Sequence, residues 1–334
     1  MKNTNSRGYN QRTIDPPLKF CAVVGPTASG KTELALALAE RSGADILCVD
    51  AMQTYRGLDV GSAKPTREER ARAAHYGLDV ASPLESFSAS RFAQYAEPLL
   101  AAAREKNRPL ILCGGTGLYY RSLLEGLFEA PDPDPDLRAR LNERAVKEGS
   151  AALYAELSAA DPETAGTIHP NDARRVTRAL EIIAQTGMRV SELRRRQQKK
   201  GWIEETCFIG LQRDPADLDE RIEARTQWMY ENGLIEETVR LLMMGCTRRH
   251  TALQALGYKE CYDYLQGRCS LAEARERTAK ETKRYARRQY TWFRRQFPTH
   301  WIRINNCADF AQIVKESLQL WRNSDNNIQK NAKM

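Results

Sequence analysis

Histidine, paired cysteines and long apolar runs are all scarce in this sequence. Its 334 residues include four histidines, and none of its eight cysteines belongs to a Cys-x-x-Cys pair, so the ligand spacing of zinc sites is absent. No run approaches the roughly 18 apolar residues of a membrane-spanning helix. The first seventeen residues also lack the apolar stretch of a secretory signal. We therefore expect no zinc, no membrane partner and a cytoplasmic location.

The residues that are present are typical of a globular protein. The chain is 42% hydrophobic and 28% charged, which is enough to bury a substantial core. At roughly 150 residues per domain, its length predicts about two domains. Cys21, Cys48 and Cys113 lie inside apolar, strand-like runs. We expect these three thiols to be buried and reduced.

Basic residues outnumber acidic ones, 51 to 43, for a net charge of +8. A positive balance does not fix a fold, but it favours a polyanionic partner. The excess is concentrated between residues 275 and 303, where ten Lys or Arg stand against two acids.

Short apolar runs alternate with helical patterns in the first part of the chain. The runs at residues 20–24, 45–49 and 109–113 predict strands, and a fourth follows at 208–212 after a long interval. Strands of this kind separated by helices indicate a parallel sheet with helices on both faces. We therefore expect an α/β fold.

The long interval between the third and fourth strands predicts a separate helical segment. It begins with APDPDPD at residues 130–136, whose prolines prevent a continuous helix. Beyond it, apolar residues recur at helical spacing. We expect residues 18–124 to form the first part of the core, 125–200 an all-helical insertion, and 205–322 the rest of the core with C-terminal helices. Residues 1–17 and 323–334 are polar ends that we expect to be flexible.

A phosphate-binding loop follows the first predicted strand and opens a helix. The pattern G-x-x-x-x-G-K-[ST] is matched by Gly25, Pro26, Thr27, Ala28, Ser29, Gly30, Lys31 and Thr32. Its glycines let backbone N–H groups converge on a diphosphate at the positive end of the helix. Lys31 adds a charge, and Thr32 can ligate Mg²⁺. The loop indicates a diphosphate or triphosphate ligand without deciding between them.

Asp50 ends the second predicted strand and has two functional interpretations. It can organise Mg²⁺ as a Walker-B carboxylate, or act as a general base at the carboxyl edge of the sheet. A third interpretation is a turn cap. Asp50 lies only one short helix after Lys31, and this favours a carboxylate on the substrate side.

With the phosphate-binding loop, a set of further motifs resembles one enzyme family. The motifs run in the family's order from about residue 20 to residue 300: Asp50-Ala51-Met52-Gln53, YRGLDVGSAKP at 55–65, Gly114-Gly115-Thr116-Gly117-Leu118-Tyr119, His169-Pro170-Asn171-Asp172, and Leu256-Gly257-Tyr258-Lys259-Glu260. In these motifs the chain resembles the bacterial tRNA dimethylallyltransferases, also called tRNA isopentenyltransferases. The resemblance implies a P-loop NTPase-like parallel sheet flanked by helices.

The resemblance also implies a reaction. Members of the family transfer a dimethylallyl group from dimethylallyl diphosphate to the exocyclic amine of the adenine just 3′ of the tRNA anticodon. By resemblance, residues 25–32 hold the donor diphosphate, Asp50 is the general base, and Arg225 helps to neutralise the leaving group. Lys31 and Thr32 complete the catalytic set, with Mg²⁺ at Thr32 as the expected cofactor.

The tRNA-binding positions carried over from the family lie in several separate segments. They are Asp50, Ala51, Met52, Gln53, Thr116, Arg138, Arg174, Arg175, Val176, Thr177, Arg178, Gln254, Ala255, Leu256, Gly257, Tyr258, Lys259, Arg287, Arg288, Gln289, Tyr290, Thr291, Trp292, Phe293 and Arg294. Ala51 stands where the family usually has Ser, so a hydroxyl contact to RNA is missing there.

The chemistry of this reaction fits the residues present. An adenine amine is a poor nucleophile, so alkylating it requires a base and a donor that ionises readily, such as an allylic diphosphate. Loop amides, Lys31, Arg225 and Mg²⁺ suit the charge that develops on the leaving diphosphate. The adenine must also leave its stack.

Helical spacing predicts two outward basic faces suited to RNA. Arg174 and Arg178 lie one turn apart, and Lys280, Arg284, Arg287 and Arg288 form a second group. Such stripes supply salt-dependent affinity for phosphates. The plainer interpretation of each is a solvated helix face.

Two other functions fit the phosphate-binding loop. One is a small-molecule or nucleotide kinase, and the other is an RNA-binding NTPase that does not prenylate. The sequence favours the prenyltransferase, acting as a monomer on the tRNA anticodon stem-loop.

Overall fold

The computed structural model of the chain describes residues 20–128, 130–132, 134–197, 200–305 and 309–331, with side chains described as far as residue 324. It divides the chain into two compact units. The core unit comprises residues up to Tyr120 and from Trp202 onward, and the helical unit is residues 121–201. The expected flexible segment at 1–17 lies outside the described residues.

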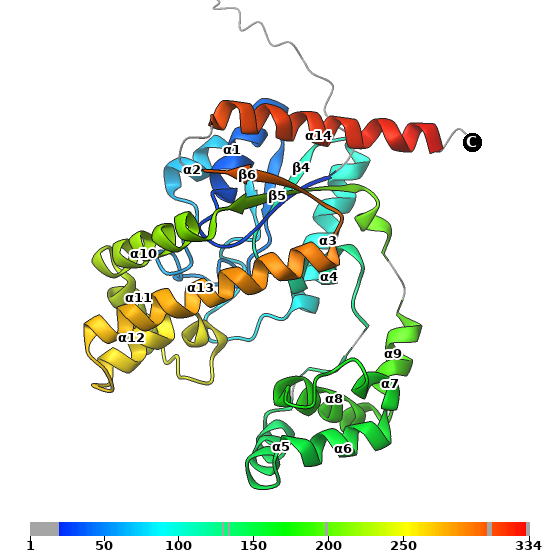
Figure 1. The fold of residues 1–334 in the computed structure, drawn as a ribbon, viewed down its shortest axis with the longest axis vertical. Helices are drawn as coiled ribbons and strands as arrows, with labels where there is room; N and C mark the ends of the chain where they lie inside the picture. The colour runs from blue at the N-terminus through cyan, green and yellow to red at the C-terminus, as the bar shows by residue number, and fades with distance from the viewer. Residues whose placement is uncertain (1–19, 129, 133, 198–199, 306–308, 332–334) are drawn as a thin grey trace, which may run out of the picture. The chain divides into compact units, whose positions relative to one another are not determined.

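The core unit is built on a sheet of six strands that all pair in parallel. In chain order the strands are β1 (Phe20–Val24), β2 (Asp45–Cys48), β3 (His75–Tyr76), β4 (Leu110–Cys113), β5 (Thr206–Arg213) and β6 (Thr299–Ile304). Across the sheet they lie in the order β3-β2-β4-β1-β5-β6 (Figure 1). The four strands expected from the sequence are confirmed. β1 and β4 are completely buried runs, which is typical of central parallel strands.

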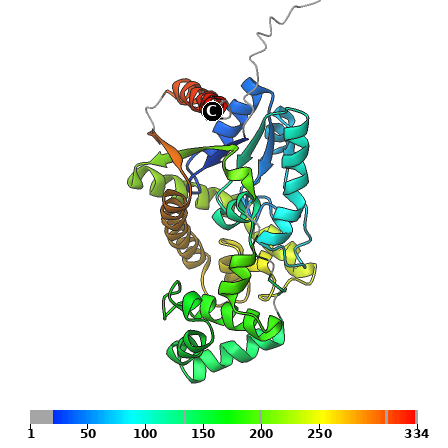
Figure 2. The same cartoon turned by 90° about the vertical axis from the view of Figure 1, so that its right-hand side faces the viewer.

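Helices cover both faces of the sheet. On one face, α1 (Lys31–Ser42) and α14 (Phe310–Asn331) lie side by side (Figures 1 and 2). On this face Val23 and Ile209 share a core with Leu34 and Trp321. On the other face Phe208 packs against aromatic rings of α4 (Gly117–Leu124) and of the segment that ends α13 (Leu271–Gln296).

The remaining helices of the core unit pack beside the sheet. They are α2 (Arg67–Arg72), α3 (Ala89–Glu105), α10 (Pro215–Glu231), α11 (Leu234–Met243) and α12 (Tyr258–Leu265), with short 3₁₀ turns at Gly201–Ile203 and Thr251–Gln254. α13 begins at a capping box formed by Ser270 and Glu273 and packs along α10 and α12.

The helical unit has a small apolar core of its own. Its helices are α5 (Pro135–Lys147), α6 (Ser150–Ala160), α7 (Pro162–Ala165), α8 (Ala173–Thr186) and α9 (Val190–Arg196). Leu141, Leu157 and Val176 meet in its interior. The Asp172 side chain caps the start of α8, and Gly187 ends this helix in the left-handed conformation that favours glycine.

Two strands and one helix end differ from the sequence-based expectation. β3 has only two residues, and β6 is an edge strand whose outward positions are polar, so neither gives an apolar run. β6 lies in the segment 205–322, where the sequence predicted one strand, at 208–212, and otherwise C-terminal helices. α14 continues through residue 331, into the expected flexible tail, and residues 332–334 are outside the described part.

The sequence also predicted buried, reduced thiols and no membrane-spanning run. Cys21, Cys48 and Cys113 are buried free thiols, which confirms that expectation. Among the described residues, no helix is both long and apolar enough to cross a membrane.

Candidate active site

The phosphate-binding loop joins β1 to α1 at the carboxyl edge of the sheet. Gly25 has a φ of 144°, and a Cβ there would lie 2.9 Å from the Leu211 carbonyl oxygen, so only glycine fits against β5. Ala28 and Gly30 also take left-handed φ values, 62° and 99°. These turns lead directly to the amino end of α1, where free backbone N–H groups favour an anion.

Lys31 is a half-buried lysine at the end of this loop. Its Nζ donates to the Pro26 carbonyl oxygen at 2.6 Å, across the turn where a diphosphate would sit. The pKa of Lys31 is lowered from 10.5 to about 8, mainly by burial and to a smaller extent by the nearby Arg225, whereas Cys113 and Asp50 oppose the shift. An anionic ligand would restore the full charge of this ammonium group.

Three arginines hold the loop from the side of β5 and α10. Arg225 donates to Thr27 Oγ1 at 3.4 Å, Arg221 to the Ala28 carbonyl oxygen at 2.9 Å, and Arg213 to the Ser29 carbonyl oxygen at 3.1 Å. Burial lowers the pKa of Arg225, and the Asp50 charge partly offsets this effect. The sequence identified only Arg225, because nothing in its spacing links Arg213 or Arg221 to a loop about 190 residues earlier.

Asp50 follows β2 and presents one carboxylate oxygen to open space. Its Oδ1 accepts hydrogen bonds from the backbone N–H groups of Met52 at 2.9 Å and Gln53 at 3.3 Å. Its other oxygen has no hydrogen-bond partner within the described chain. The neighbouring Ala51 N–H donates to Thr116 Oγ1 at 3.0 Å, which ties this turn to the end of β4. Asp50 is thus fixed in orientation and keeps one oxygen able to accept a proton.

The loop and Asp50 open onto one cavity of about 640 Å³, including its mouth. Its wall combines the loop with strand ends and α13: Thr27, Lys31, Thr32, Ala35, Ile46, Cys48, Asp50, Gln53, Ser62, Ala63, Pro65, His75, Cys113, Gly114, Gly115, Arg225, Tyr285 and Gln289. Anion-binding groups and an apolar strip therefore share a single space.

Gln289 links α13 to the phosphate-binding loop. Its Oε1 accepts from the Thr27 N–H at 2.8 Å, and its Nε2 donates to the Gly115 carbonyl oxygen at 2.9 Å. Both ends of this amide are used inside the protein, although the sequence placed Gln289 among the RNA contacts. One turn earlier, Tyr285 lines the cavity, where burial and the Asp50 charge raise its pKa to about 12.

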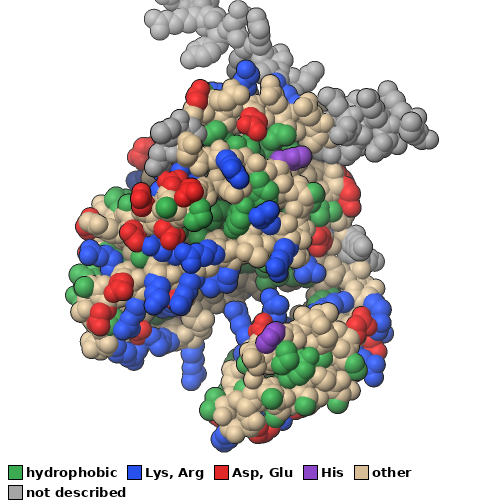
Figure 3. Space-filling view, viewed as in Figure 1, with side chains coloured by type: hydrophobic (Ala, Val, Ile, Leu, Met, Phe, Trp, Pro, Cys, Tyr) green, Lys and Arg blue, Asp and Glu red, His purple; other side chains and the backbone are tan. Residues whose placement is uncertain are grey.

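The other expected tRNA positions on α13 divide by exposure. Arg287, Arg288 and Arg294 are exposed, and Figure 3 shows Lys and Arg side chains gathered over α10 and α13. In contrast, Phe293 is completely buried and stacks edge-on against Tyr120. The remaining positions of the segment are the half-buried Tyr290 and Trp292 and the exposed Thr291.

The segment at residues 254–259 lies mostly inside the core unit. Gly257 and Ala255 are buried, and Tyr258 is completely buried, with its hydroxyl donating to Glu237 Oε2 at 2.6 Å. Gln254 is exposed, and Leu256 and Lys259 are half-buried. The side chain of Tyr258 therefore supports the fold and is not available to RNA.

In the helical unit a single buried carboxylate organises two of the expected RNA-binding arginines. The Glu181 side chain is completely buried, and its carboxylate pairs with Arg138 at 2.7 Å and with Arg178 at 2.8 Å. Arg174 and Arg175 are exposed. Val176 and Thr177 are buried, so their side chains pack within the unit and do not face solvent.

Several cavity residues escaped the sequence-based interpretation. Ser62, Ala63 and Pro65 come from an irregular loop, His75 from the two-residue strand β3, and Tyr285 from a helix 235 positions after Asp50. The only signal for the first three was the motif at residues 55–65, and its family resemblance assigned them no role.

Sequence comparisons identify relatives over most of the chain. The family model described as IPP transferase matches residues 53–296. A tRNA dimethylallyltransferase 2 of Geotalea daltonii is 39% identical over 311 residues, which cover 92% of this chain and 94% of that protein. A tRNA dimethylallyltransferase of Anaeromyxobacter sp. (strain K) is 45% identical over 285 residues, covering 85% and 93% respectively.

Solved structures give the same picture. The full-length tRNA isopentenylpyrophosphate transferase from Bacillus halodurans is similar with a TM-score of 0.70 and 37% identity, covering 95% of this chain and 99% of that one. A eukaryotic dimethylallyltransferase acting on tRNA has a TM-score of 0.74 at 24% identity, covering 94% and 80%, and this likeness shows the fold.

Proposed function

The chain belongs to the IPP transferase family, and from this membership we propose that it is a tRNA dimethylallyltransferase. It transfers a dimethylallyl group from dimethylallyl diphosphate to the exocyclic amine of the adenine 3′-adjacent to the tRNA anticodon and releases diphosphate. It acts in the cytoplasm, where tRNA is modified, and one chain supplies every residue that the reaction requires, so a monomer suffices.

One observation carries the proposal: a phosphate-binding loop and a carboxylate with a free oxygen open onto the same cavity. Prenyl transfer requires both within reach of one carbon atom, because the leaving group and the nucleophile act on that carbon. The apolar strip formed by Ala35, Ile46 and Cys48 suits a five-carbon group.

The donor diphosphate binds at the amino end of α1. The free backbone N–H groups at the amino end of α1 bind it, and Lys31 and Arg225, which both bond the loop, contribute positive charge. As the C–O bond breaks, its electron pair passes to the diphosphate. The same groups stabilise that growing charge, which lowers the barrier.

The residues of the loop fit a magnesium ion bound together with diphosphate. Thr32, which carries a hydroxyl group, is among the residues that line the cavity, whereas no cluster of three His, Cys, Asp or Glu residues occurs in the described chain. Mg²⁺ characteristically binds through one or two protein ligands and the substrate phosphates. When bound, the ion would neutralise charge on the leaving diphosphate.

Asp50 takes the proton of the attacking amine. The amine nitrogen forms the new bond to the allylic carbon, and its proton passes to the free oxygen of Asp50. The hydrogen bonds to Met52 and Gln53 hold the carboxylate in position throughout.

The test is a reconstituted reaction without nucleotide. Purified protein, unmodified tRNA, dimethylallyl diphosphate and Mg²⁺ should yield prenylated RNA and an equal amount of diphosphate. A kinase or an RNA-binding NTPase would require ATP and would leave the RNA unprenylated. Absence of prenylated RNA under these conditions, with both substrates bound, would refute the proposal.

A further inference from the structure

The cavity wall next to Asp50 is an irregular loop, residues 55–65. Ser62, Ala63 and Pro65 of this loop line the cavity together with Gln53. Ala63 takes a left-handed φ of 47°, a conformation that alanine adopts only where surrounding contacts enforce it. The question is what holds the loop in this shape.

Glu237 on α11 holds the first half of the loop. Its Oε1 accepts hydrogen bonds from the backbone N–H groups of Asp59 at 3.1 Å and Val60 at 2.8 Å. Its Oε2 accepts one from the Gly61 N–H at 3.3 Å. The carboxylate is buried. A Cβ at Gly61 would lie 2.5 Å from the Tyr258 ring, so the loop is also packed tightly against α12.

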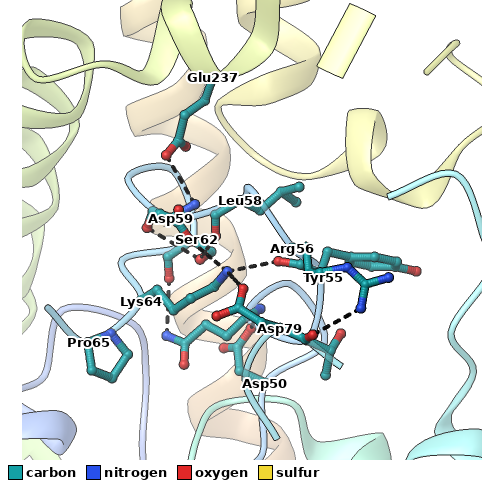
Figure 4. A network of polar contacts seen from close by, with 12 residues as sticks. Asp50, Tyr55, Arg56, Leu58, Asp59, Ser62, Lys64, Pro65, Asp79 and Glu237 are labelled. Atoms are coloured by element: carbon teal, nitrogen blue, oxygen red, sulfur yellow. Dashed lines mark hydrogen bonds and ion pairs between the residues drawn. The ribbon is translucent and has the colours of Figure 1, made fainter. Parts of the chain in front are cut away.

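Lys64 holds the second half of the loop and lies at the centre of the network in Figure 4. Its Nζ donates to the Tyr55 carbonyl oxygen at 2.8 Å, and to carboxylate oxygens of Asp59 and Asp79 at 2.7 Å each. All three ammonium protons are therefore used. The side chain is 1% exposed, and a buried ammonium group persists only with such complete pairing.

The loop in turn fixes the orientation of Gln53. The Gln53 side-chain nitrogen donates to the carbonyl oxygens of Ser62 at 3.2 Å and Ala63 at 3.1 Å. Two carbonyl acceptors can be satisfied only by the NH₂ end of an amide. The carbonyl end, Oε1, therefore points elsewhere, and within the described chain it has no hydrogen-bond partner. Gln53 also lines the cavity and bonds Asp50 through its backbone.

We infer that Lys64 is a positioning residue: by fixing the loop at 55–65, it orients the Gln53 amide so that its carbonyl oxygen selects an exocyclic amine on the acceptor base. The inference rests on the proposed function. An amine carries two hydrogens, one for Asp50 and one for Gln53 Oε1. A base with a carbonyl group at that position would place two acceptor oxygens against each other. The substrate feature read here is thus an amino group on a purine.

Binding measurements test this inference apart from chemistry. Two anticodon stem-loop RNAs are compared that differ only in adenine or hypoxanthine at the acceptor position. The measured quantity is the dissociation constant of the hypoxanthine RNA divided by that of the adenine RNA. The wild-type protein should favour adenine. Gln53→Met should lower this ratio about tenfold, the usual order for one hydrogen bond. Lys64→Met should also lower this ratio. The variant that carries both substitutions should have the same ratio as Gln53→Met alone.

Additional variants separate positioning from general loss of stability. Arg72→Met removes an ion pair with Glu40 elsewhere in the core unit, and its ratio should equal that of wild type. Asp59→Ala, at an exposed partner of Lys64, serves if Lys64→Met does not fold, and it should also lower the ratio.

Three outcomes would overturn the inference: equal binding of both RNAs by wild type, an unchanged ratio in Gln53→Met, or an unchanged ratio in both loop variants. Prenylation by wild type is assayed separately. Failure of the inference is therefore distinguishable from failure of the proposed function.

Discussion

Individual residues of the cavity owe their chemistry to different physical causes. Asp50 remains usable as a base because only one of its oxygens is engaged by backbone N–H groups. Lys31, in contrast, is defined by burial, which makes its proton easier to lose than that of an exposed lysine. Each condition leads to a measurement on a single side chain.

Replacing Asp50 by Asn should abolish chemistry while preserving binding. Asn keeps the shape and the hydrogen bonds to residues 52 and 53 but cannot accept the amine proton, so single-turnover prenylation should fall about 10² to 10⁴-fold. Donor and tRNA affinities, and the Mg²⁺ dependence of donor binding, should stay near wild type. Asp45→Asn, at the opposite end of β2, is the matched control. Asp50 would instead be a metal ligand if the variant bound donor poorly until Mg²⁺ was raised and then prenylated normally.

Donor binding should depend on the protonation of Lys31. Because its pKa in the free protein is about 8, the ammonium charge is complete well below pH 8 and lost above it. Affinity for dimethylallyl diphosphate should therefore be constant at low pH and decline above pH 8, and Lys31→Met should bind weakly without this decline. Affinity that stayed constant to about pH 9.5 would contradict the assignment, given an ordinary lysine pKa near 10.4.

The lowered pKa of Lys31 also affects folding stability, which rises with pH in the range where donor affinity falls. Between pH 8 and 10.5 the unfolded chain holds a proton that the folded chain has released. In that window this one group makes the free energy of unfolding rise with pH.

At the scale of elements, helices carry basic residues with two distinct roles. On α8, Arg174 and Arg175 are exposed, whereas Arg178 bonds the buried Glu181 and the Pro131 carbonyl oxygen at 2.6 Å. The helical spacing alone assigns all three to one outward face. Only the exposed Arg174 and Arg175 can bind a phosphate without breaking a bond to a buried group.

Arg174→Ala with Arg175→Ala should weaken tRNA binding through electrostatics alone. The slope of log affinity against log salt should become shallower, by about 0.7 to 0.9 per lost phosphate contact. The thermal midpoint should stay near wild type. Arg178→Ala should instead lower the midpoint, because it removes a partner of a buried carboxylate. An unchanged salt slope in the double variant would identify this face as merely solvated.

At the scale of the whole molecule, the helical unit is an insertion whose two ends meet. The Lys200 N–H donates to the Glu125 carbonyl oxygen at 3.2 Å, and the Gln197 side chain donates to Gly126 at 2.6 Å. The chain thus leaves and re-enters the core unit at neighbouring points. All residues that line the cavity belong to the core unit.

Replacing residues 127–199 by a short flexible linker should leave a folded core. Because the ends already touch, closing the gap adds little entropic cost. The shortened protein should bind dimethylallyl diphosphate with near wild-type affinity and lose most of its tRNA affinity. Circular dichroism and donor binding verify the core. A shortened chain that did not fold would show that the two units depend on each other for stability.

The sequence by itself determined the features that depend on local spacing. The phosphate-binding loop is contiguous, and its glycines are required by the backbone turn that they make. The central strands are recognisable because parallel strands buried on both faces are continuously apolar. The proline-rich segment that begins at residue 130 likewise leads directly into α5 of the helical unit.

Only the tertiary structure decided which distant side chains share the cavity and which are buried and hydrogen-bonded within the protein. Gln289 and Tyr258 lie in motifs that resemble RNA-binding segments, yet both are buried and bond groups far away in the sequence. Arg221 shows no local pattern, and the motif at 55–65 assigned Lys64 no role, because their contacts are fixed by how α10 and this loop pack. Spacing determines which face of an element a residue occupies, but packing determines what that face meets.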